Sequence, residues 1–287
     1  MVLYNSTIRQ PEVLLKETLR KQFQIIGHQG GSGAMPGNTI HAFMHALKTG
    51  INEIELDVLM TADGELVVTD HAVLTPLHYY HPLIKEEQKV NDLTYAELQE
   101  YDYGRKFNSH YPFRKNISST IPLLKNVLAR IEKFVLWNNS RPVKYFIDIK
   151  TSPATDNVYH PKPEELILKL TDLIRTLNIA RRCTVISSDV RPLQLMHRLN
   201  QNVTIGLKVE NEESIEDNIE ALGFLPGIYM PEYHAVSREM IYTVQAKGMK
   251  LIPHGANDLL DMNELLCMGV DGVITDYPQH AAKLLQE

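Results

Sequence analysis

Short apolar stretches and longer amphipathic stretches alternate regularly along the second half of the sequence. The amphipathic stretches carry apolar residues at helical spacing, and the apolar stretches have the length of buried strands. The predicted strands cover residues 144–150, 184–188, 204–209, 227–230, 250–253 and 272–275, with two earlier ones at 23–27 and 54–58. Eight strand–helix units predict an α/β fold, a (β/α)8 TIM barrel that spans residues 1–287 as one domain. The alternative, an open doubly wound sheet, lacks a glycine-rich dinucleotide fingerprint after its first strand.

The predicted helices have recognisable start and stop signals. Residues 11–22 form an amphipathic pattern with a proline near its start, and a helix capped by Asn38 or Thr39 stops at Gly50. The remaining helices are predicted at residues 121–133, 164–177, 192–199, 212–221, 237–247, 259–268 and 280–286.

The chain departs from simple alternation after the second strand. The turn at residues 61–64 is too short for a parallel crossover, so residues 65–69 are predicted to form an antiparallel hairpin with that strand. Residues 72–120 are rich in Tyr, His and Pro and contain one helix-like piece at 93–101. Long segments of this kind in compact domains are commonly lids or binding loops, so we expect a lid-like insertion here.

Composition narrows the function classes. The 287 residues carry a formal net charge of −6, which argues against a nucleic-acid partner bound through a basic face. The two cysteines, Cys183 and Cys267, lie far apart in apolar segments and are expected to be buried free thiols. Charged residues interrupt any signal-peptide core, and no window has the length of an apolar membrane span, so we expect a soluble cytoplasmic protein. The sequence does not indicate the oligomeric state.

Polar residues gather where the predicted strands end, on the face where barrel enzymes place their active sites. Glu55 and Asp57 are two residues apart in one strand and therefore point to the same side. With Asp148 they form the set of oxygen ligands expected for Mg²⁺ or Ca²⁺ rather than Zn²⁺. For any one of these carboxylates, the alternative is a solvated rim position or pairing with Lys150. The candidates at this face are His28, Glu55, Asp57, Asp148, Lys150, Ser187, Lys208, Glu232 and His254.

Several short motifs follow one another in a fixed order along the chain. They include His28-x-Gly30, Pro36-x-Asn38-Thr39, Ile54-Glu55-x-Asp57-Val58, Thr61-x-Asp63-Gly64, Ile147-Asp148-Ile149-Lys150 and the closing stretch from Gly269 to Pro278. As a set, over roughly residues 23 to 280, they resemble the glycerophosphodiester phosphodiesterase family. The resemblance implies a barrel in which a divalent cation, Mg²⁺ or Ca²⁺, and two histidines cleave a phosphodiester. By that likeness Glu55, Asp57 and Asp148 hold the metal, His28 is one acid–base histidine, and Lys150 contacts the phosphate.

The sequence departs from the family pattern at several of these positions. Gln29 stands where the family has arginine, so one cationic contact to the phosphate is missing. Gly37 stands where the family has glutamate before Asn-Thr. Asp148 replaces a glutamate, a substitution also found in the related phospholipase D toxin branch.

The second histidine is also displaced relative to the family. The chain reads Asp70-His71 where the family has His-Asp, and His254 begins a His-Gly-Ala-Asn stretch in place of Trp-Thr-x-Asn. We assign the second acid–base role to His71, because the loop after the hairpin can absorb a shift of one residue. Asp70 and His254 are the alternatives for that role. The residues expected to contact substrate are Lys150, Gln29, Lys208 and His254.

These residues suit hydrolysis of a small-molecule phosphodiester. The expected substrates are glycerophosphodiesters or lysophospholipid-like diesters, and the products are an alcohol and a phosphomonoester or cyclic phosphate. One histidine takes a proton from the attacking hydroxyl, of water or of the substrate, and the other protonates the leaving oxygen. Two other classes stay open. They are a catalytically impaired relative that binds a phosphate ester at the barrel mouth, and a metal-dependent barrel hydrolase of other substrates.

Overall fold

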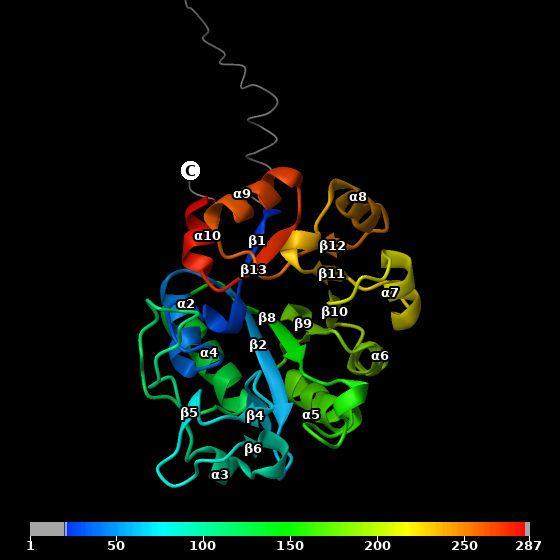
Figure 1. Ribbon diagram of the computed structural model, residues 1–287. Coiled ribbons are helices and arrows are strands. Elements are labelled where there is room, and N and C mark those ends of the chain that lie inside the picture. Colours follow the sequence, from blue (N-terminus) through cyan, green and yellow to red (C-terminus); the bar gives the residue numbers. More distant parts are fainter. Residues whose placement is uncertain (1–19, 21, 285–287) are drawn as a thin grey trace, which may run out of the picture.

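Eight parallel strands form a nearly closed barrel in the computed structural model, which describes residue 20 and residues 22–284 (Figure 1). Neighbouring strands follow the order β12-β11-β10-β9-β8-β2-β1-β13. Backbone hydrogen bonds close the remaining gap, from Ile274 N to the Pro253 carbonyl oxygen (2.9 Å) and from Gly255 N to the Ile274 carbonyl oxygen (3.1 Å). The barrel predicted from the sequence is confirmed. Its strands are β1 (Gln24–Gly27), β2 (Glu53–Met60), β8 (Lys144–Ile149), β9 (Cys183–Ser187), β10 (Thr204–Val209), β11 (Ile228–Pro231), β12 (Lys250–Leu251) and β13 (Gly272–Thr275).

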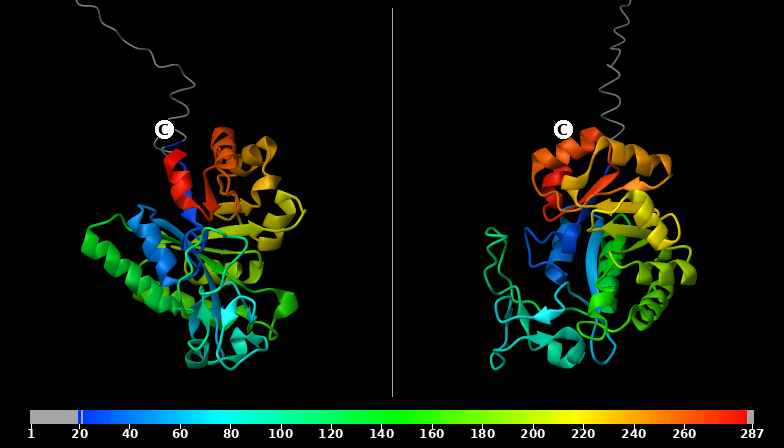
Figure 2. Two further views of the ribbon diagram at one scale, coloured as in Figure 1. Left: turned by 60° about the vertical axis from the view of Figure 1, so that its left-hand side comes forward. Right: turned by 45° about the vertical axis from the view of Figure 1, so that its right-hand side comes forward.

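A helix follows each barrel strand and covers the outside of the barrel (Figures 1 and 2). The helix predicted to end near residue 133 continues to Asn138, where Asn139 in the left-handed region (φ 47°) ends it. The helix predicted over residues 11–22 lies outside the described residues, apart from residues 20 and 22. The observed helices are α2 (Ile40–Lys48), α4 (Leu124–Asn138), α5 (Pro163–Thr176), α6 (Val190–Leu199), α7 (Ile215–Leu222), α8 (Arg238–Ala246), α9 (Leu259–Met268) and α10 (Pro278–Leu284). Short 3-10 turns add η3 (Pro153–Thr155), η4 (Ala180–Arg182) and η5 (Tyr233–Ala235).

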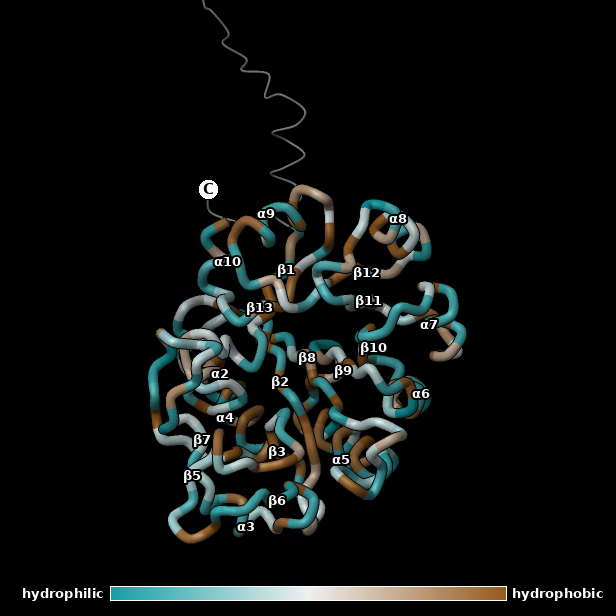
Figure 3. The backbone as a smooth tube through the Cα atoms, viewed as in Figure 1, coloured by the Kyte–Doolittle hydropathy of each residue, from teal (hydrophilic) through white to brown (hydrophobic). Residues whose placement is uncertain are grey.

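Side chains of the barrel strands alternate between the helices outside and the barrel interior. Ile54, Leu56 and Val58 of β2 pack into the large core between strands and helices, so Glu55 and Asp57 face the interior. Hydrophobic stretches of this outer core gather at β3, α4 and α5 (Figure 3). A smaller apolar cluster fills the interior below the mouth, and it consists of Ile26, Phe146, Ile186, Ile228, Met230, Ile252 and Ile274.

The hairpin and the insertion after β2 are both present. β3 (Leu66–Val68) pairs antiparallel with β2, with Leu66 opposite Met60. Within residues 72–120, β4 (Val73–Leu74) pairs with β6 (Gln88–Lys89), and β5 (Tyr79–Tyr80) pairs with β7 (Asp102–Tyr103). The segment also contains η2 (Val90–Asp92) and α3 (Tyr95–Leu98).

The insertion packs around a hydrophobic cluster of its own. Leu74, Tyr79, Val90 and Leu98 are buried in this cluster together with Leu59 and Val67 of the hairpin. Its last stretch runs beside α2 (Figures 1 and 2), where Lys115 N donates to the Ala34 carbonyl oxygen at 3.1 Å. The insertion therefore contacts the loop that follows β1.

Two further sequence expectations can be compared with the structure. Among the described residues, no helix has both the length and the apolar character needed to cross a bilayer. Cys183 and Cys267 are both free thiols. Cys183 is buried as expected, but the expectation was wrong for Cys267, because α9 turns Met262 and Leu265 toward the core and leaves Cys267 exposed.

Candidate active site

His28 lies directly after β1, at the start of a tight turn formed by η1 (His28–Gly30). Gln29, Gly30 and Gly31 have φ values of 52°, 80° and 99°, which turn the chain sharply. A Cβ atom at Gly30 would lie 2.7 Å from the Phe43 ring of α2, so glycine is what lets η1 and α2 approach this closely. The turn places the His28 imidazole at the mouth of the barrel.

Asp276, which follows β13, fixes the orientation of His28. A hydrogen bond of 2.6 Å joins His28 Nδ1 to Asp276 Oδ1. This bond leaves Nε2 of His28 on the side of Glu55, 3.9 Å from Oε2. Three further donors bind the Asp276 carboxylate, and they are Ser32 Oγ, Tyr111 Oη and Asn257 Nδ2.

The charges around His28 favour its protonated form. Burial alone would lower the His28 pKa, but the negative charge of Glu55 and the hydrogen bond to Asp276 outweigh burial and raise the pKa to about 10. The same hydrogen bond lowers the pKa of Asp276 to about 2, against the effect of its burial. At neutral pH the two side chains form an imidazolium–carboxylate pair whose Nε2 proton faces Glu55.

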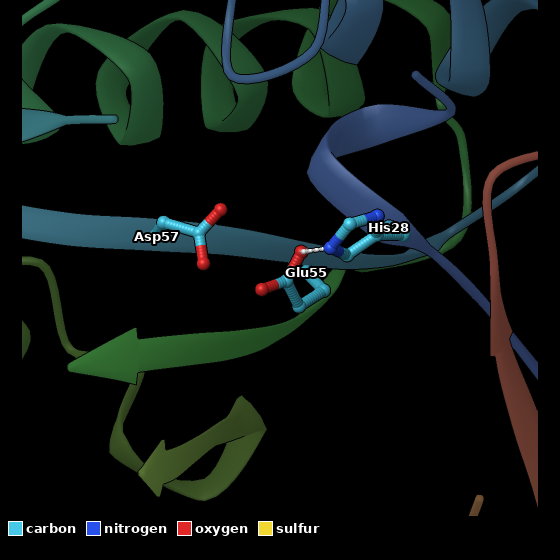
Figure 4. A group of neighbouring side chains, drawn as sticks. All are labelled: His28, Glu55 and Asp57. Carbon is cyan, nitrogen blue, oxygen red and sulfur yellow. Dashed lines mark ion pairs between the residues drawn. The ribbon is translucent and has the colours of Figure 1, made fainter. Parts of the chain in front are cut away.

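Three buried carboxylates lie together on two adjacent strands. Glu55 and Asp57 are on β2, and Asp148 on β8 pairs in register with Asp57. Figure 4 shows Glu55 beside His28 and Asp57 further along β2. One potential ligand atom from each of His28, Glu55 and Asp57 lies within 4.8 Å of the other two. The fold thus brings two of the predicted metal ligands, Glu55 and Asp57, together with His28, and Asp148 is joined to Asp57 through Lys150.

Amide groups hold Asp57 in place. Its Oδ2 accepts hydrogen bonds from Gln29 Nε2 (2.9 Å) and Asn38 Nδ2 (2.7 Å). The backbone N–H of Gln29 also donates to Glu55 Oε2 at 2.8 Å. Gln29, which we predicted to contact substrate, is buried and directs its side chain to Asp57. Thr39 caps α2, so Asn38 is available to bind Asp57.

Two lysines lie beside the carboxylates. Lys150 Nζ bridges Asp57 Oδ1 (2.7 Å) and Asp148 Oδ2 (2.6 Å). Burial opposes the charged form of Lys150, but Asp148 and Asp57 outweigh it and raise the Lys150 pKa well above its usual range. Lys208 Nζ lies 2.7 Å from Glu210 Oε1 and 3.7 Å from Asp148 Oδ2. Both lysines are therefore already paired with carboxylates.

The carboxylates still outnumber the positive charges beside them. With their neighbours Glu210 and Asp276 these carboxylates number five, against the three positive charges of Lys150, Lys208 and protonated His28, which leaves two negative charges when all five ionise. Burial and the charge of Asp57 raise the pKa of Glu55. Asp57 Oδ1 lies 2.7 Å from Lys150 Nζ but receives no well-directed hydrogen bond from the described residues. A divalent cation would supply the missing charge, and buried oxygen ligands suit Mg²⁺ or Ca²⁺, so the donor set fits such an ion.

A cavity of about 100 Å³ opens at the mouth above the apolar interior. Its polar lining consists of His28, Glu55, Asp148, Lys208, His254, Asn257, Thr275 and Asp276. His254 follows β12, and its buried Nε2 has no hydrogen-bond partner among the described residues. Burial and the positive charge of Lys208 lower the His254 pKa to about 4, so its imidazole is neutral at neutral pH.

His71 is held by the insertion and is not among the residues that line the cavity at the mouth. Its Nδ1 is 2.9 Å from Tyr79 Oη, and its Nε2 is 3.8 Å from Asp70 Oδ2. Two residues earlier, Thr69 N donates to the Asp57 carbonyl oxygen at 3.0 Å, which joins the start of this loop to β2. The structure therefore separates the two candidate histidines, because His28 lies at the mouth by Asp276 and His71 lies against the tyrosines of the insertion.

Sequence reasoning missed the residues that orient His28. Asp276 stands directly after β13, and its place at a strand end could have identified it. Tyr111 comes from the insertion, and no sequence pattern connects it to the barrel mouth. Two other strand-end candidates contribute little here. Ser187 is buried and donates to the Ile149 carbonyl oxygen at 2.7 Å, and Glu232 is exposed.

Comparisons with known proteins identify the family to which this chain belongs. The model of the glycerophosphoryl diester phosphodiesterase family matches residues 28–280. A glycerophosphodiester phosphodiesterase of Bacillus altitudinis is 29% identical over 269 residues, which cover 92% of this chain and 98% of the relative. Lysophospholipase D GDPD1 of Rattus norvegicus is 24% identical over 307 residues, covering 95% of this chain and 90% of the relative.

Solved structures share the fold. A Silicibacter pomeroyi protein named "putative glycerophosphoryl diester phosphodiesterase" has a structure that superposes with a TM-score of 0.80 at 24% identity, covering 92% of this chain and 93% of that chain. A phosphodiesterase from Oleispira antarctica, in complex with the product sn-glycerol-3-phosphate, has a TM-score of 0.73 at 20% identity and covers 92% of this chain and 97% of that chain. The chain belongs to the glycerophosphoryl diester phosphodiesterase family and is a phosphoric diester hydrolase.

Proposed function

We propose that this hydrolase cleaves glycerophosphodiesters in a reaction that depends on a divalent cation and on two histidines. The observation that carries the proposal is the position of the His28–Asp276 pair against the buried carboxylates of Glu55 and Asp57. Folding alone gains nothing from burying more carboxylates than positive charges in one place, because unpaired buried charges destabilise the folded state. Such a cluster suits a cation and an anionic substrate.

Glu55, Asp57 and Asp148 are the residues we assign to the cation, which is Mg²⁺ or Ca²⁺. When bound, the cation neutralises charge on the phosphate oxygens and makes the phosphorus easier to attack. Gln29 and Asn38 keep Asp57 Oδ2 occupied, which leaves Oδ1 for the cation and for Lys150.

Lys150 and Lys208 are assigned to the substrate phosphate. Both ammonium groups lie beside Asp148, and a phosphodiester that enters next to Asp148 meets two positive charges. These charges stabilise the additional negative charge that the equatorial oxygens carry in the transition state. The neutral His254 imidazole lines the same cavity and is assigned to the alcohol portion of the substrate.

His28 is assigned the role of general acid and His71 that of general base. Asp276 keeps His28 protonated, so Nε2 can give its proton to the leaving oxygen as the phosphorus–oxygen bond breaks. His71 takes the proton of the attacking hydroxyl, which belongs either to water or to the substrate. Attack by water gives a phosphomonoester, and attack by a neighbouring substrate hydroxyl gives a cyclic phosphate.

The substrate range is a further part of the proposal. The relative from Rattus norvegicus is named a lysophospholipase D, and the Oleispira antarctica enzyme holds sn-glycerol-3-phosphate. Both names point to diesters of a glycerol phosphate. We therefore include lysophospholipids with glycerophosphodiesters, and the insertion is assigned the role of a lid over this substrate.

The test is a turnover assay of the purified chain on glycerophosphocholine, glycerophosphoethanolamine and lysophosphatidylcholine, with Mg²⁺ or Ca²⁺ and then with chelator. We expect turnover that chelator abolishes and that His28→Ala and His71→Ala each reduce about 100-fold or more. His41→Ala, a change at an exposed histidine of α2, is the matched control and should leave turnover unchanged.

The leaving group separates the two histidine roles. A nitrophenyl diester needs no protonation of its leaving oxygen, so His28→Ala should lose much less activity on it than on glycerophosphocholine. His71→Ala should lose activity on both. An equal loss for His28→Ala on both substrates would refute its role as general acid. Phosphate-ester binding without any turnover would favour the catalytically impaired alternative.

A further inference from the structure

The site lacks the arginine that the family pattern carries at position 29. Gln29 does not replace that charge, because its carboxamide is neutral and donates to Asp57. Lys150 and Lys208 are each paired with carboxylates in this structure. A phosphodiester at the mouth would therefore benefit from a cation that no carboxylate neutralises.

The insertion supplies a cation of that kind. Arg114 is 7% exposed and is the one lysine or arginine among the buried side chains of the described residues. Its Nε and Nη1 have no hydrogen-bond partner there, and no carboxylate among those residues forms an ion pair with it. Nη2 donates to the Lys106 carbonyl oxygen at 3.5 Å, a weak bond, and the guanidinium lies beside the side chain of Tyr103. A buried guanidinium without an anionic partner is costly, so the position calls for a function.

The surroundings of Arg114 connect it to both candidate histidines. Its guanidinium carbon lies 6.0 Å from the centre of the Tyr111 ring and 5.9 Å from the centre of the Tyr103 ring. Tyr111 Oη donates to Asp276, the partner of His28. The Tyr103 ring lies 5.8 Å from the ring of His71. Arg114 thus lies against one tyrosine that binds the partner of His28 and against another that packs on His71.

We propose that Arg114 binds the phosphate of the substrate, so that the insertion provides the positive charge that position 29 lacks. The inference rests on the proposed function of the site. A guanidinium presents several N–H groups in one plane and binds two oxygens of a phosphate at once. The tyrosine rings and one long hydrogen bond hold the side chain, so it can turn toward an anion at the mouth without breaking an ion pair.

The test compares binding of inorganic phosphate and of sn-glycerol-3-phosphate by isothermal titration calorimetry, with the divalent cation present throughout. Arg114→Gln should raise both dissociation constants about tenfold or more, the effect of losing one charge-assisted interaction. Arg114→Lys keeps the charge without the planar fork and should fall between wild type and Arg114→Gln. Arg105→Gln is the control, because Arg105 lies in the same insertion but is exposed and paired with Asp102.

A second readout separates phosphate binding from support of the fold. Added guanidinium should restore part of the phosphate affinity of Arg114→Gln, which a purely structural role would not allow. If Arg114→Gln does not fold, wild type labelled with ¹⁵N-arginine provides the test. Comparison with the spectrum of Arg114→Lys identifies the Nε–H resonance of Arg114, because that resonance is missing from the variant. In wild type this resonance should shift when phosphate is added.

Two outcomes distinguish this inference from the proposed function. The role of Arg114 would be overturned, and the proposed function would stand, if Arg114→Gln showed normal diester turnover and unchanged phosphate affinity. The same conclusion would follow if phosphate did not shift the resonance of Arg114. The proposed function would be overturned, and this inference would stand, if wild type showed no diester turnover while Arg114→Gln still bound phosphate more weakly than wild type.

Discussion

Asp57 and Asp148 lie directly opposite each other on β2 and β8, and Lys150 Nζ stands within 2.7 Å of one oxygen of each. The register of the two strands enforces this arrangement, and all three side chains are largely buried. Lys150 therefore has two roles, because it neutralises part of the carboxylate charge and also lies where a substrate phosphate would bind.

Replacing Lys150 by Met should destabilise the cation-free protein. The change leaves Asp57 and Asp148 buried without their positive partner, and breaking a buried pair costs about 3 kcal/mol or more. Denaturant unfolding at neutral pH in chelator measures the loss. Lys125→Met, at an exposed pair with Glu65, should change the free energy of unfolding by less than about 1 kcal/mol. Added Mg²⁺ or Ca²⁺ should restore stability to Lys150→Met more than to wild type, and the absence of such a difference would count against a cation at this cluster.

The stability of the cation-free protein should fall as pH rises above neutrality. The pKa of His28 is raised to about 10 in the folded state, so its stabilising contribution is complete below its usual pKa near 6.5 and is lost as pH approaches 10. The pKa of Glu55 is also raised, so its ionisation at increasing pH destabilises the folded state in the same direction.

Thermal unfolding between pH 6 and pH 10 in chelator measures how stability changes with pH. The pH values are chosen around the titrations of His28 and Glu55. Asp276→Asn removes a main cause of the His28 shift and should flatten the slope at its alkaline end. Saturation with a divalent cation should flatten it as well, since the cation replaces protons as the balancing charge. A flat profile in the chelated wild type would show that the two side chains are not shifted in this way.

Gly37→Ala should weaken the cation site through Gln29. A Cβ atom at Gly37 would lie 2.2 Å from Gln29 Oε1, so even the smallest side chain pushes the carboxamide away from Asp57. Loss of such a supporting hydrogen bond typically costs about 10-fold in metal affinity. Calorimetric titration with Mg²⁺ or Ca²⁺ measures the effect.

A double-mutant cycle provides the control for that prediction. Gln29→Ala removes the carboxamide itself and should weaken cation binding by a similar factor. If both changes act on the same contact, the double variant Gln29→Ala/Gly37→Ala should be no weaker than Gln29→Ala alone. Additive losses would mean that Gly37 acts on the site by another route.

The sequence predicted the barrel because its signals are local. Each strand and helix is specified by the spacing of its own apolar residues, and a run of eight such units leaves little choice of architecture. The gathering of Glu55, Asp57 and Asp148 followed from the same rule, because carboxyl ends of parallel strands meet at one face.

The supporting contacts could not be predicted because they join distant parts of the chain. His28 and Asp276 are separated by 248 positions, and Tyr111 reaches the site from an insertion without regular periodicity. The two departures at Gln29 and Gly37 look independent in the sequence. Only the fold shows that they occupy the same space.

The most direct test of the account is the dependence of turnover on one bound cation. Chelated wild-type protein is titrated with Mg²⁺ or Ca²⁺, and bound metal and glycerophosphocholine hydrolysis are measured on the same samples. The account predicts no hydrolysis in the chelated protein and hydrolysis that rises in proportion to one bound cation per chain, with both binding and turnover lost in Asp57→Asn. Full hydrolysis by protein that elemental analysis shows to be metal-free would contradict it.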